Sequence, residues 1–415
     1  MTLTLPTRTF PLERRDRQWL SSHVAYLIGP MSMPGIDDIR SAAGELMRQY
    51  PKGRLDWRLD GAGGRWVADR SPESLVTEGQ WEPDQTAGDL LGTLRGSSSD
   101  AAPLIFVRYP EHLGVAVSHA IADGRNAMAM LSSLAYASIG GEIAEWASRP
   151  GRRSPLLTAG VKTFGAHPAK IRECLQDRHP HSSDAVAGTV MPWQPSPRVI
   201  AATFDKSAAD PMLAWAREQE PRPSYFALMT CALLRAFRVA GLAVAKDVSV
   251  MVDIRRYLGQ DWIDGNFIAN VPMPVDADTA PQHFSTMVRT TMRSGRPVAS
   301  QMLSSWRLGR PGRPMPAPAT AVDMGLPARI TLTDIGTPPH GDRLPIVGGR
   351  LPEVYGAGVG DGPHGMTVCL GHSATSTTIT VSFNDNVIDA HRVRRALGVL
   401  SADPSALVCS GSAAL

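Results

Sequence analysis

The chain has 415 residues, of which 43% are hydrophobic and 20% are charged, values close to those of globular proteins. At roughly 150 residues per domain, this length predicts two domains, each large enough to bury a core of its own. The formal net charge of +3, from 42 basic and 39 acidic residues, is too balanced to indicate a nucleic-acid partner.

The first part of the chain predicts helices and strands in alternation. In segment 37–50, apolar residues recur at helical spacing, which predicts an amphipathic helix. Two short strands are expected on either side of the glycine-rich turn 61–64. Segments 104–109 and 113–119 are predicted to be strands joined by a short turn, and a helix is expected to follow at 125–139.

The second half begins again with a strand, after a change in composition. We place an N-terminal lobe at 1–175, a proline-rich linker at 176–198 and a C-terminal lobe at 199–415. The predicted strands are 199–204, 247–254, 328–333, 366–372 and 377–383, and the predicted helices are 211–219, 224–240, 281–294 and 389–400. Residues 295–320 are rich in Pro, Gly and Arg without periodicity, so a loop is expected there. This irregular mixture favours two α/β lobes over one doubly wound sheet.

Cysteines and apolar runs indicate the compartment. The chain has no CxxC pair among its four cysteines, which are Cys174, Cys231, Cys369 and Cys409. In a chain of this length, they predict reduced thiols in the cytoplasm rather than a disulfide framework or zinc site. The most apolar run, 226–245, contains Arg235 and Arg238, so no membrane span is expected. The N-terminal residues also lack the apolar core of a signal peptide.

The clearest functional pattern is VAVSHAIADG at residues 115–124. Alternation along the strand places His119 on the same face as the apolar residues before it, at the point where the strand leaves the sheet. Asp123 follows in the turn before a helix, and Gly124 is expected to permit a tight or left-handed backbone conformation there. A histidine in a loop held by a carboxylate is well placed as a general base, because its ordinary pKa is near neutrality.

Residue spacing alone leaves other roles to be weighed for the histidines and for the glycine-rich segment 356–362. A lone histidine beside an apolar strand is more often a structural residue than a catalytic one. A metal site would need a third ligand near His112 and His119, and the sequence offers none nearby, so no metal is expected. The alternating glycines at 356–362 do not lie between a strand and a helix, which argues against a dinucleotide-binding loop.

The segment around His119 resembles the HxxxDG motif of the CoA-dependent acyltransferase superfamily. That superfamily includes chloramphenicol acetyltransferase, the plant BAHD acyltransferases, the polyketide-associated acyltransferases and the condensation domains of nonribosomal peptide synthetases. Further segments resemble the family in the expected order over most of the chain. Residues 248–255 (VSVMVDIR) resemble its V-D-x-R strand, 264–266 (DGN) its G-N, 330–336 (ITLTDIG) its S-N-x-G strand, and 380–385 (TVSFND) its closing segment.

The resemblance implies two chloramphenicol-acetyltransferase-like lobes, each a mixed sheet flanked by helices, with an active-site tunnel at their interface. It implies acyl transfer from acyl-CoA or a carrier-bound phosphopantetheinyl thioester to a hydroxyl or amine, with His119 as general base and no further cofactor. In the family the motif aspartate pairs with the V-D-x-R arginine, so Asp123, Gly124 and Arg255 are expected to support the active site. From the sequence pattern alone, a solvated charge at Arg255 is as good an interpretation as a partner of Asp123. Candidates for contacts with an oxyanion or the acceptor, with ordinary turn roles as the alternative, are Ser118, Asn266, Ser382 and Asn384.

Two departures bear on the subfamily. Ser118 stands where peptide-bond-forming condensation domains carry the first of two histidines, and 355–358 (YGAG) is only a faint match to the BAHD motif DFGWG. These departures favour a free-standing bacterial acyltransferase of specialised metabolism. A stand-alone condensation-type enzyme that acts on a carrier-bound substrate is the alternative, and a non-catalytic binding protein is the candidate of another class.

The expected partners are an acyl thioester, a small-molecule acceptor and, in the condensation version, an acyl or peptidyl carrier protein. The arginines at 295–313 are candidates for contact with CoA phosphates or an acidic carrier, against the simpler interpretation of a solvated loop. Because one chain already provides both walls of the cleft, the resemblance implies a monomer.

Overall fold

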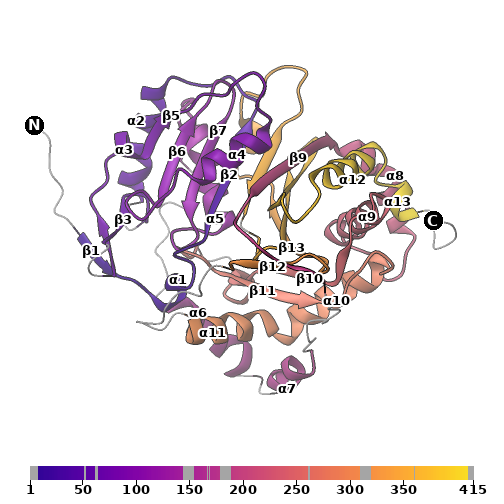
Figure 1. Cartoon of the computed structure of the whole chain (residues 1–415). Coiled ribbons are helices and arrows are strands. Elements are labelled where there is room, and N and C mark those ends of the chain that lie inside the picture. Colours follow the sequence, from indigo (N-terminus) through magenta and orange to yellow (C-terminus); the bar gives the residue numbers. More distant parts are fainter. Residues whose placement is uncertain are drawn as a thin grey trace, which may run out of the picture.

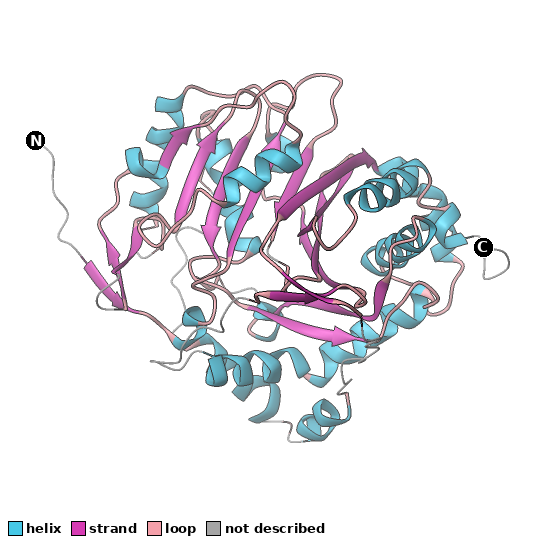
Figure 2. Cartoon of the chain, viewed as in Figure 1, coloured by secondary structure: helices cyan, strands magenta, loops and turns pink. Residues whose placement is uncertain are grey.

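The computed structural model describes residues 8–50, 53–60, 64–143, 154–165, 167, 169–177, 188–259, 262–308, 319–358 and 360–409. Two lobes, each a mixed sheet with helices, lie side by side (Figure 1). Figure 2 shows helices packed around the sheet of each lobe. The predicted α/β architecture with two lobes is confirmed.

Within the described residues, the N-terminal lobe is built on a five-stranded sheet in the order β14-β2-β7-β6-β5. Its strands are β2 (His23–Gly29), β5 (Val76–Glu78), β6 (Leu104–Arg108), β7 (Leu113–Ser118) and β14 (Glu353–Ala357). Strand β7 lies in the middle and every one of its residues is buried. Strand β14 comes from the second half of the chain and pairs antiparallel with β2, so a C-terminal segment completes this sheet.

Helices cover both faces of this sheet. On one face lie α2 (Ile36–Gln49), α3 (Pro72–Leu75) and α5 (Gly124–Ala137), and on the other lies α4 (Ala87–Arg95). Helices α2 and α5 form where helices were predicted. Alternation along β7 explains the two cores, because Val115 and Val117 pack toward α5 whereas Ala116 packs toward α4. A small sheet of β1 (Arg8–Pro11), β3 (Trp57–Asp60) and β4 (Arg65–Ala68), and the short helix α1 (Arg14–Arg17), lie beside it.

The part of the C-terminal lobe that the structure describes contains a six-stranded sheet in the order β11-β10-β13-β15-β16-β9. Its strands are β9 (Pro197–Asp205), β10 (Val244–Asp253), β11 (Ile268–Met273), β13 (Ala328–Gly336), β15 (Gly365–His372) and β16 (Ser376–Asn384). Strands β10, β13 and β15 run parallel, and the remaining neighbours are antiparallel. The sheet is therefore mixed. Five of its strands form where strands were predicted, and β11 was not predicted.

One face of this second sheet is covered by helices and the other faces the first lobe (Figure 1). The covering helices are α8 (Asp210–Arg217), α9 (Tyr225–Val239), α10 (Pro281–Ser294), α12 (Ala390–Ala402) and α13 (Ala406–Cys409). Helices α9 and α12 begin as predicted, with the Ser224 and Asp389 side chains accepting backbone N–H groups as N-caps. On the opposite face, β14 packs against β15 and β16 and so joins the two sheets.

The loop predicted for residues 295–320 is wrong over most of its described part, which forms helix α11 (Arg296–Leu308). Gly295 ends the preceding helix in the left-handed region, with φ of 78°. The new helix then buries Val298, Gln301 and Ser305, at helical spacing. Because two of these buried residues are polar, apolar periodicity does not reveal the helix. Residues 309–318, with two of the arginines proposed to meet CoA, lie outside the described residues, as do 61–63 and 178–187.

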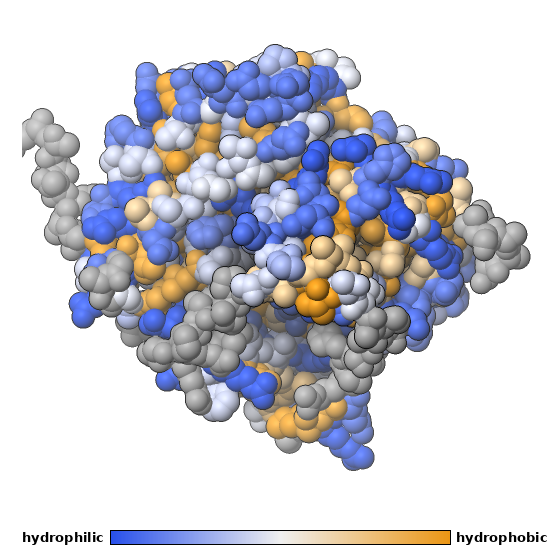
Figure 3. Space-filling model, viewed as in Figure 1, coloured by the Kyte–Doolittle hydropathy of each residue, from blue (hydrophilic) through white to orange (hydrophobic). Residues whose placement is uncertain are grey.

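Three helices at the bottom of Figure 1 span the lower edges of the two lobes: α6 (Pro155–Gly160), α7 (Ala169–Gln176) and α11. Large apolar side chains on them are exposed, and orange surface appears in this lower part of Figure 3. A two-stranded sheet pairs β8 (Val190–Pro192) with β12 (Ala321–Asp323). Across the described residues, no helix is long and apolar enough to cross a membrane. The four cysteines form no disulfide.

Candidate active site

A cavity of about 1110 Å³ lies between the two sheets and is lined by both lobes. The C-terminal sheet contributes alternate residues to it: Met251, Asp253, Thr331, Thr333, Thr367 and Cys369. Their neighbours in sequence, such as Leu332 and Val368, point to the opposite face and pack under the helices. The two-residue period of the strands thus gives one sheet both an apolar core face and a partly polar cavity face.

His119 lies at the end of β7 and lines this cavity. Its backbone N–H donates to the Ser22 carbonyl at 2.7 Å, and its side chain is buried apart from the cavity face. Imidazole Nδ1 lies 3.2 Å from the Ala122 carbonyl oxygen, and the Trp19 ring packs against the imidazole with a centroid distance of 5.5 Å. When Nδ1 carries the proton and donates it to Ala122, the lone pair is on Nε2.

Burial lowers the pKa of His119 below its ordinary value, and this effect outweighs the opposing influence of the Asp123 charge and the Ala122 carbonyl. The imidazole is therefore neutral near pH 7. A neutral imidazole with one nitrogen engaged by a backbone carbonyl and the other available to a cavity can accept a proton.

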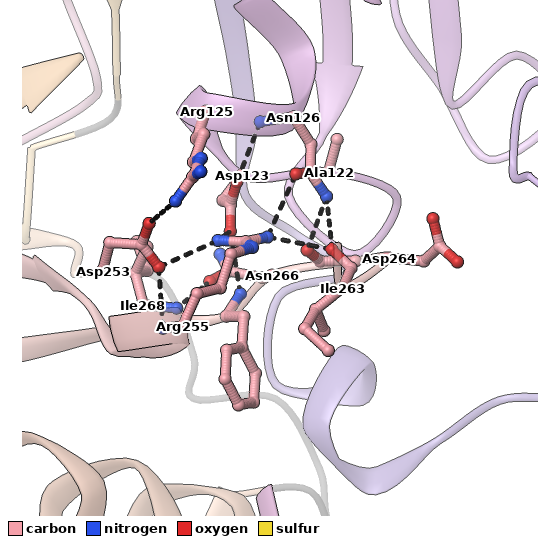
Figure 4. Close-up of polar contacts among 12 residues, drawn as sticks. Ala122, Asp123, Arg125, Asn126, Asp253, Arg255, Ile263, Asp264, Asn266 and Ile268 are labelled. Carbon is pink, nitrogen blue, oxygen red and sulfur yellow. Dashed lines mark hydrogen bonds and ion pairs between the residues drawn. The ribbon is translucent and has the colours of Figure 1, made fainter. Parts of the chain in front are cut away.

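The Asp123 carboxylate is fully buried, and its partners among the described residues are the Asn126 and Phe267 N–H groups and Arg255. Its Oδ1 accepts the Asn126 N–H at 3.1 Å, which caps α5, and its Oδ2 accepts the Phe267 N–H at 2.9 Å. Oδ2 also lies 2.7 Å from Arg255 Nη1. These contacts join the HxxxDG loop of the first lobe to the segment 265–267 of the second (Figure 4).

Arg255 lies just after β10, in the short 3-10 helix Ile254–Tyr257, and is 1% exposed. It pairs with Asp123 and with Asp253, and it donates to the Ile263 carbonyl at 2.9 Å and the Asn126 side-chain oxygen at 3.1 Å. Burial lowers the pKa of Arg255, but the charges of Asp123 and Asp253 outweigh it and hold the pKa above the ordinary value. Arg255 is therefore a buried interlobe residue, not the solvated charge that pattern alone allowed.

Of the two conformations expected for Gly124, the left-handed one is not found, because its φ lies outside that region. A Cβ atom at this position would lie 2.9 Å from the Tyr26 hydroxyl oxygen and 3.2 Å from Ile335 Cγ2. Glycine is thus required by the close approach of two side chains, one from each lobe, rather than by the backbone turn.

Of the four residues expected to contact an oxyanion or acceptor, Asn266 is the one placed at the imidazole. Its Nδ2 lies 3.2 Å from His119 Nδ1, and its Oδ1 accepts the Ile268 N–H at 3.2 Å. Ser118 Oγ accepts the Ala120 N–H, and Asn384 donates to the carbonyls of 362 and 363. Ser382 is buried in β16, and its hydroxyl has no hydrogen-bond partner among the described residues. None of the four, Asn266 included, is among the cavity-lining residues that the structure describes.

The sequence reasoning missed several residues that hold the His119 loop. Arg54 donates to the Ala120 carbonyl at 2.7 Å and lies 2.7 Å from the fully buried Asp16 carboxylate. Arg125, directly after the motif, pairs across the lobes with Asp253 at 2.7 Å. No spacing rule joins residues so distant in the chain, although a basic residue following HxxxDG could have prompted a search for an acidic partner in the second lobe.

Comparisons with known proteins find similar solved structures but no similar sequence family. No protein-family model and no curated protein matches the sequence. The condensation domain of the Monacolin K polyketide synthase matches with a TM-score of 0.60 and 13% identity, over 96% of this chain and 98% of that one. Polyketide synthase associated protein 5 from Mycobacterium tuberculosis matches with a TM-score of 0.57 and 13% identity, over 97% and 98%.

The epimerization domain from the third module of tyrocidine synthetase B matches over 99% of both chains, with a TM-score of 0.55 and 11% identity. The chain has the condensation-domain fold. This is the fold of the superfamily that the HxxxDG segment resembles. In this fold, His119 lies on the cavity that residues of both lobes line.

Proposed function

We propose that this protein transfers an acyl group from a thioester to a hydroxyl or amine of a small molecule, with His119 as the general base. The observation that carries the proposal is the placement of a buried, neutral imidazole on a cavity between the lobes of a condensation-domain fold. Its Nδ1 is engaged by the Ala122 carbonyl, so Nε2 is the nitrogen available to a reactant.

In the proposed reaction, the acceptor oxygen or nitrogen attacks the thioester carbonyl carbon while His119 Nε2 takes its proton. The resulting tetrahedral intermediate collapses as the carbon–sulfur bond breaks, and the imidazolium returns the proton to the leaving thiolate. A base placed in this way typically contributes about 10²–10⁴-fold in rate. Holding donor and acceptor together in the cavity adds the advantage of proximity and orientation.

Asp123 and Arg255 act as positioning residues in this proposal. Both carboxylate oxygens of Asp123 are occupied by backbone N–H groups and Arg255, so the carboxylate has no contact with the imidazole of the kind found in hydrolase triads. Their ion pair instead fixes the loop that carries His119 against the second lobe. The Ala122 carbonyl, which orients the imidazole, is part of that loop.

The donor in this proposal is acyl-CoA or a phosphopantetheinyl thioester, and no metal takes part. A cavity of about 1110 Å³ exceeds a typical single-ligand pocket of about 300–1,000 Å³, which suits two substrates that meet in it. The second candidate is a condensation-type reaction with a carrier-bound donor. Likeness to a condensation domain that mediates chain release from the enacyloxin polyketide synthase, with a TM-score of 0.53 and 13% identity over 100% and 86% of the chains, favours this version.

The test incubates the protein with a panel of acyl-CoA and acyl-carrier thioesters, each combined with alcohol or amine acceptors. The quantity measured is the rate of thiol release. We expect release that requires both substrates and is lost in His119→Ala. The exposed His391 on α12 offers a matched control, so His391→Ala retains the wild-type rate. Release with carrier-bound donors alone selects the condensation version. Absence of release with every pair, or equal rates in wild type and His119→Ala, would overturn the proposal.

A further inference from the structure

The arginines that line the cavity are already neutralised by carboxylates. Arg255 and Arg125 both line the cavity, and both are neutralised by carboxylates. Arg255 pairs with Asp123 at 2.7 Å and with Asp253 at 3.1 Å, and Arg125 pairs with Asp253 at 2.7 Å. Two cations thus meet two anions, and this cluster leaves no net charge for a substrate.

Asp334 adds a further carboxylate to the cavity wall, near the end of β13. Its Oδ1 accepts the Gly336 N–H at 2.8 Å and lies 3.3 Å from His372 Nε2. Among the described residues, no arginine or lysine forms an ion pair with it, and its side chain is 34% exposed. Asp361, the remaining carboxylate on the cavity wall, is 91% exposed and lies 3.8 Å from Arg329. Among the described lining residues, Asp334 is therefore the less exposed of the two carboxylates outside the Arg255–Arg125 cluster, and no arginine or lysine neutralises it.

Asp334 lies close to the loop of His119. The neighbouring residue Ile335 approaches Gly124 so closely that a Cβ atom there would be 3.2 Å away. Asp334 also lines, with Arg125 and Asp253, an adjoining pocket of about 630 Å³. Burial raises the pKa of the Cys369 thiol on the cavity wall, and the negative charge of Asp334 adds to that effect. A cleft with low-dielectric walls and an excess of one sign concentrates ligands of the opposite charge.

We propose that Asp334 binds a positively charged ammonium group of the acceptor, so that the acceptor is an amino alcohol or a diamine. This inference rests on the proposed acyl transfer. A nitrogen held as ammonium has no lone pair with which to attack. The nucleophile presented to His119 is therefore a second group of the same molecule, a hydroxyl or a second amine. His372 Nε2 lies 3.3 Å from Oδ1. Among the described residues, Oδ2 has no ion-pair or hydrogen-bond partner, so it is the oxygen that we assign to the ligand.

The first test compares acceptors in matched pairs. Ethanolamine, leucinol and phenylalaninol are each assayed against an analogue in which a methyl group replaces the ammonium. Asp334→Asn keeps an oxygen for the Gly336 N–H and removes the charge, so we expect KM for the amino alcohols to rise about 10–100-fold. The KM for the thioester and for the methyl analogues stays unchanged. Asp361→Asn is the matched control and leaves all these values at the wild-type level.

The second test measures binding of the same pairs by ligand-observed NMR and does not depend on turnover. Wild type and Asp361→Asn are expected to bind the amino alcohols about 10-fold or more tightly than their methyl analogues, and Asp334→Asn to lose this preference. If Asp334→Asn does not fold, Asp334→Ser replaces it, because its hydroxyl also accepts an N–H. Amine binding without any thiol release refutes the acyl transfer but retains the cation site. No amine binding, or a preference that Asp334→Asn leaves intact, overturns the inference.

Discussion

Removal of the Asp123 carboxylate should unfold the junction between the lobes before it affects any chemical step. Asp123 is fully buried and Arg255 is 1% exposed, with 2.7 Å between Oδ2 and Nη1. Breaking a buried pair by removing one partner costs about 3–5 kcal/mol, because the remaining charge is left without compensation. Asp123 also caps α5, and loss of an N-cap costs about 1 kcal/mol. Arg255 retains Asp253, so the lower end applies to the pair. We expect Asp123→Ala to lose about 4 kcal/mol.

The assay is urea unfolding followed by tryptophan fluorescence and circular dichroism together, because coincident curves are needed to treat the transition as two-state. The matched control is Asp361→Ala, which removes a carboxylate that is 91% exposed and should change stability by less than about 0.5 kcal/mol. A double variant with Arg255→Met should be less destabilised than the sum of the single changes, since no unpaired charge remains. If Asp123→Ala unfolds at the wild-type urea concentration yet loses turnover, the positioning role is refuted.

Three further predictions concern the imidazole and its surroundings. The pKa of His119 lies below its ordinary value of 6.5 through burial, and the imidazolium cannot accept a proton. We therefore expect kcat/KM to fall only as pH drops below 6.5 and to be flat above it; a midpoint above 7 contradicts this. Asn266→Asp places a negative charge beside Nδ1 and should raise the pKa of His119, which moves the midpoint of the pH profile upward, whereas Asn266→Ala should not. Gly124→Ala forces a Cβ atom against the Tyr26 hydroxyl and should cost about 1–3 kcal/mol in urea unfolding, part of which Tyr26→Phe restores. If adding Tyr26→Phe to Gly124→Ala recovers no stability, the Cβ atom does not clash with the Tyr26 hydroxyl.

Local periodicity accounts for the parts of the fold that were predicted. Strand β7 and helices α2, α9 and α12 bury apolar residues at regular spacing, and Ser224 and Asp389 mark the starts of two helices. Helix α11 was missed because its buried face includes Gln301 and Ser305. The spacing of apolar residues also could not show that β14 pairs with β2 in the first sheet. These two strands are far apart in the sequence, so their pairing depends on tertiary packing.

The candidate site was predictable only as far as its motif extends. His119 and Asp123 are four residues apart, and the resemblance brought in Arg255, which the structure places against Asp123. The resemblance did not supply the reason for Gly124, which depends on Tyr26 and Ile335 from two different strands. Nor could it choose Asn266 over Ser382 and Asn384, because the distance from each of these residues to the imidazole is set by how the two lobes meet.

The central claim is that His119 is the base of an acyl transfer, and product formation with a single reactive donor and acceptor pair tests it most directly. Mass spectrometry of the acceptor should show the added acyl group with wild type and with His391→Ala. His119→Ala, shown by circular dichroism to keep its fold, should form product at least about 10²-fold more slowly. Product formed by a folded His119→Ala protein at the wild-type rate would contradict the claim.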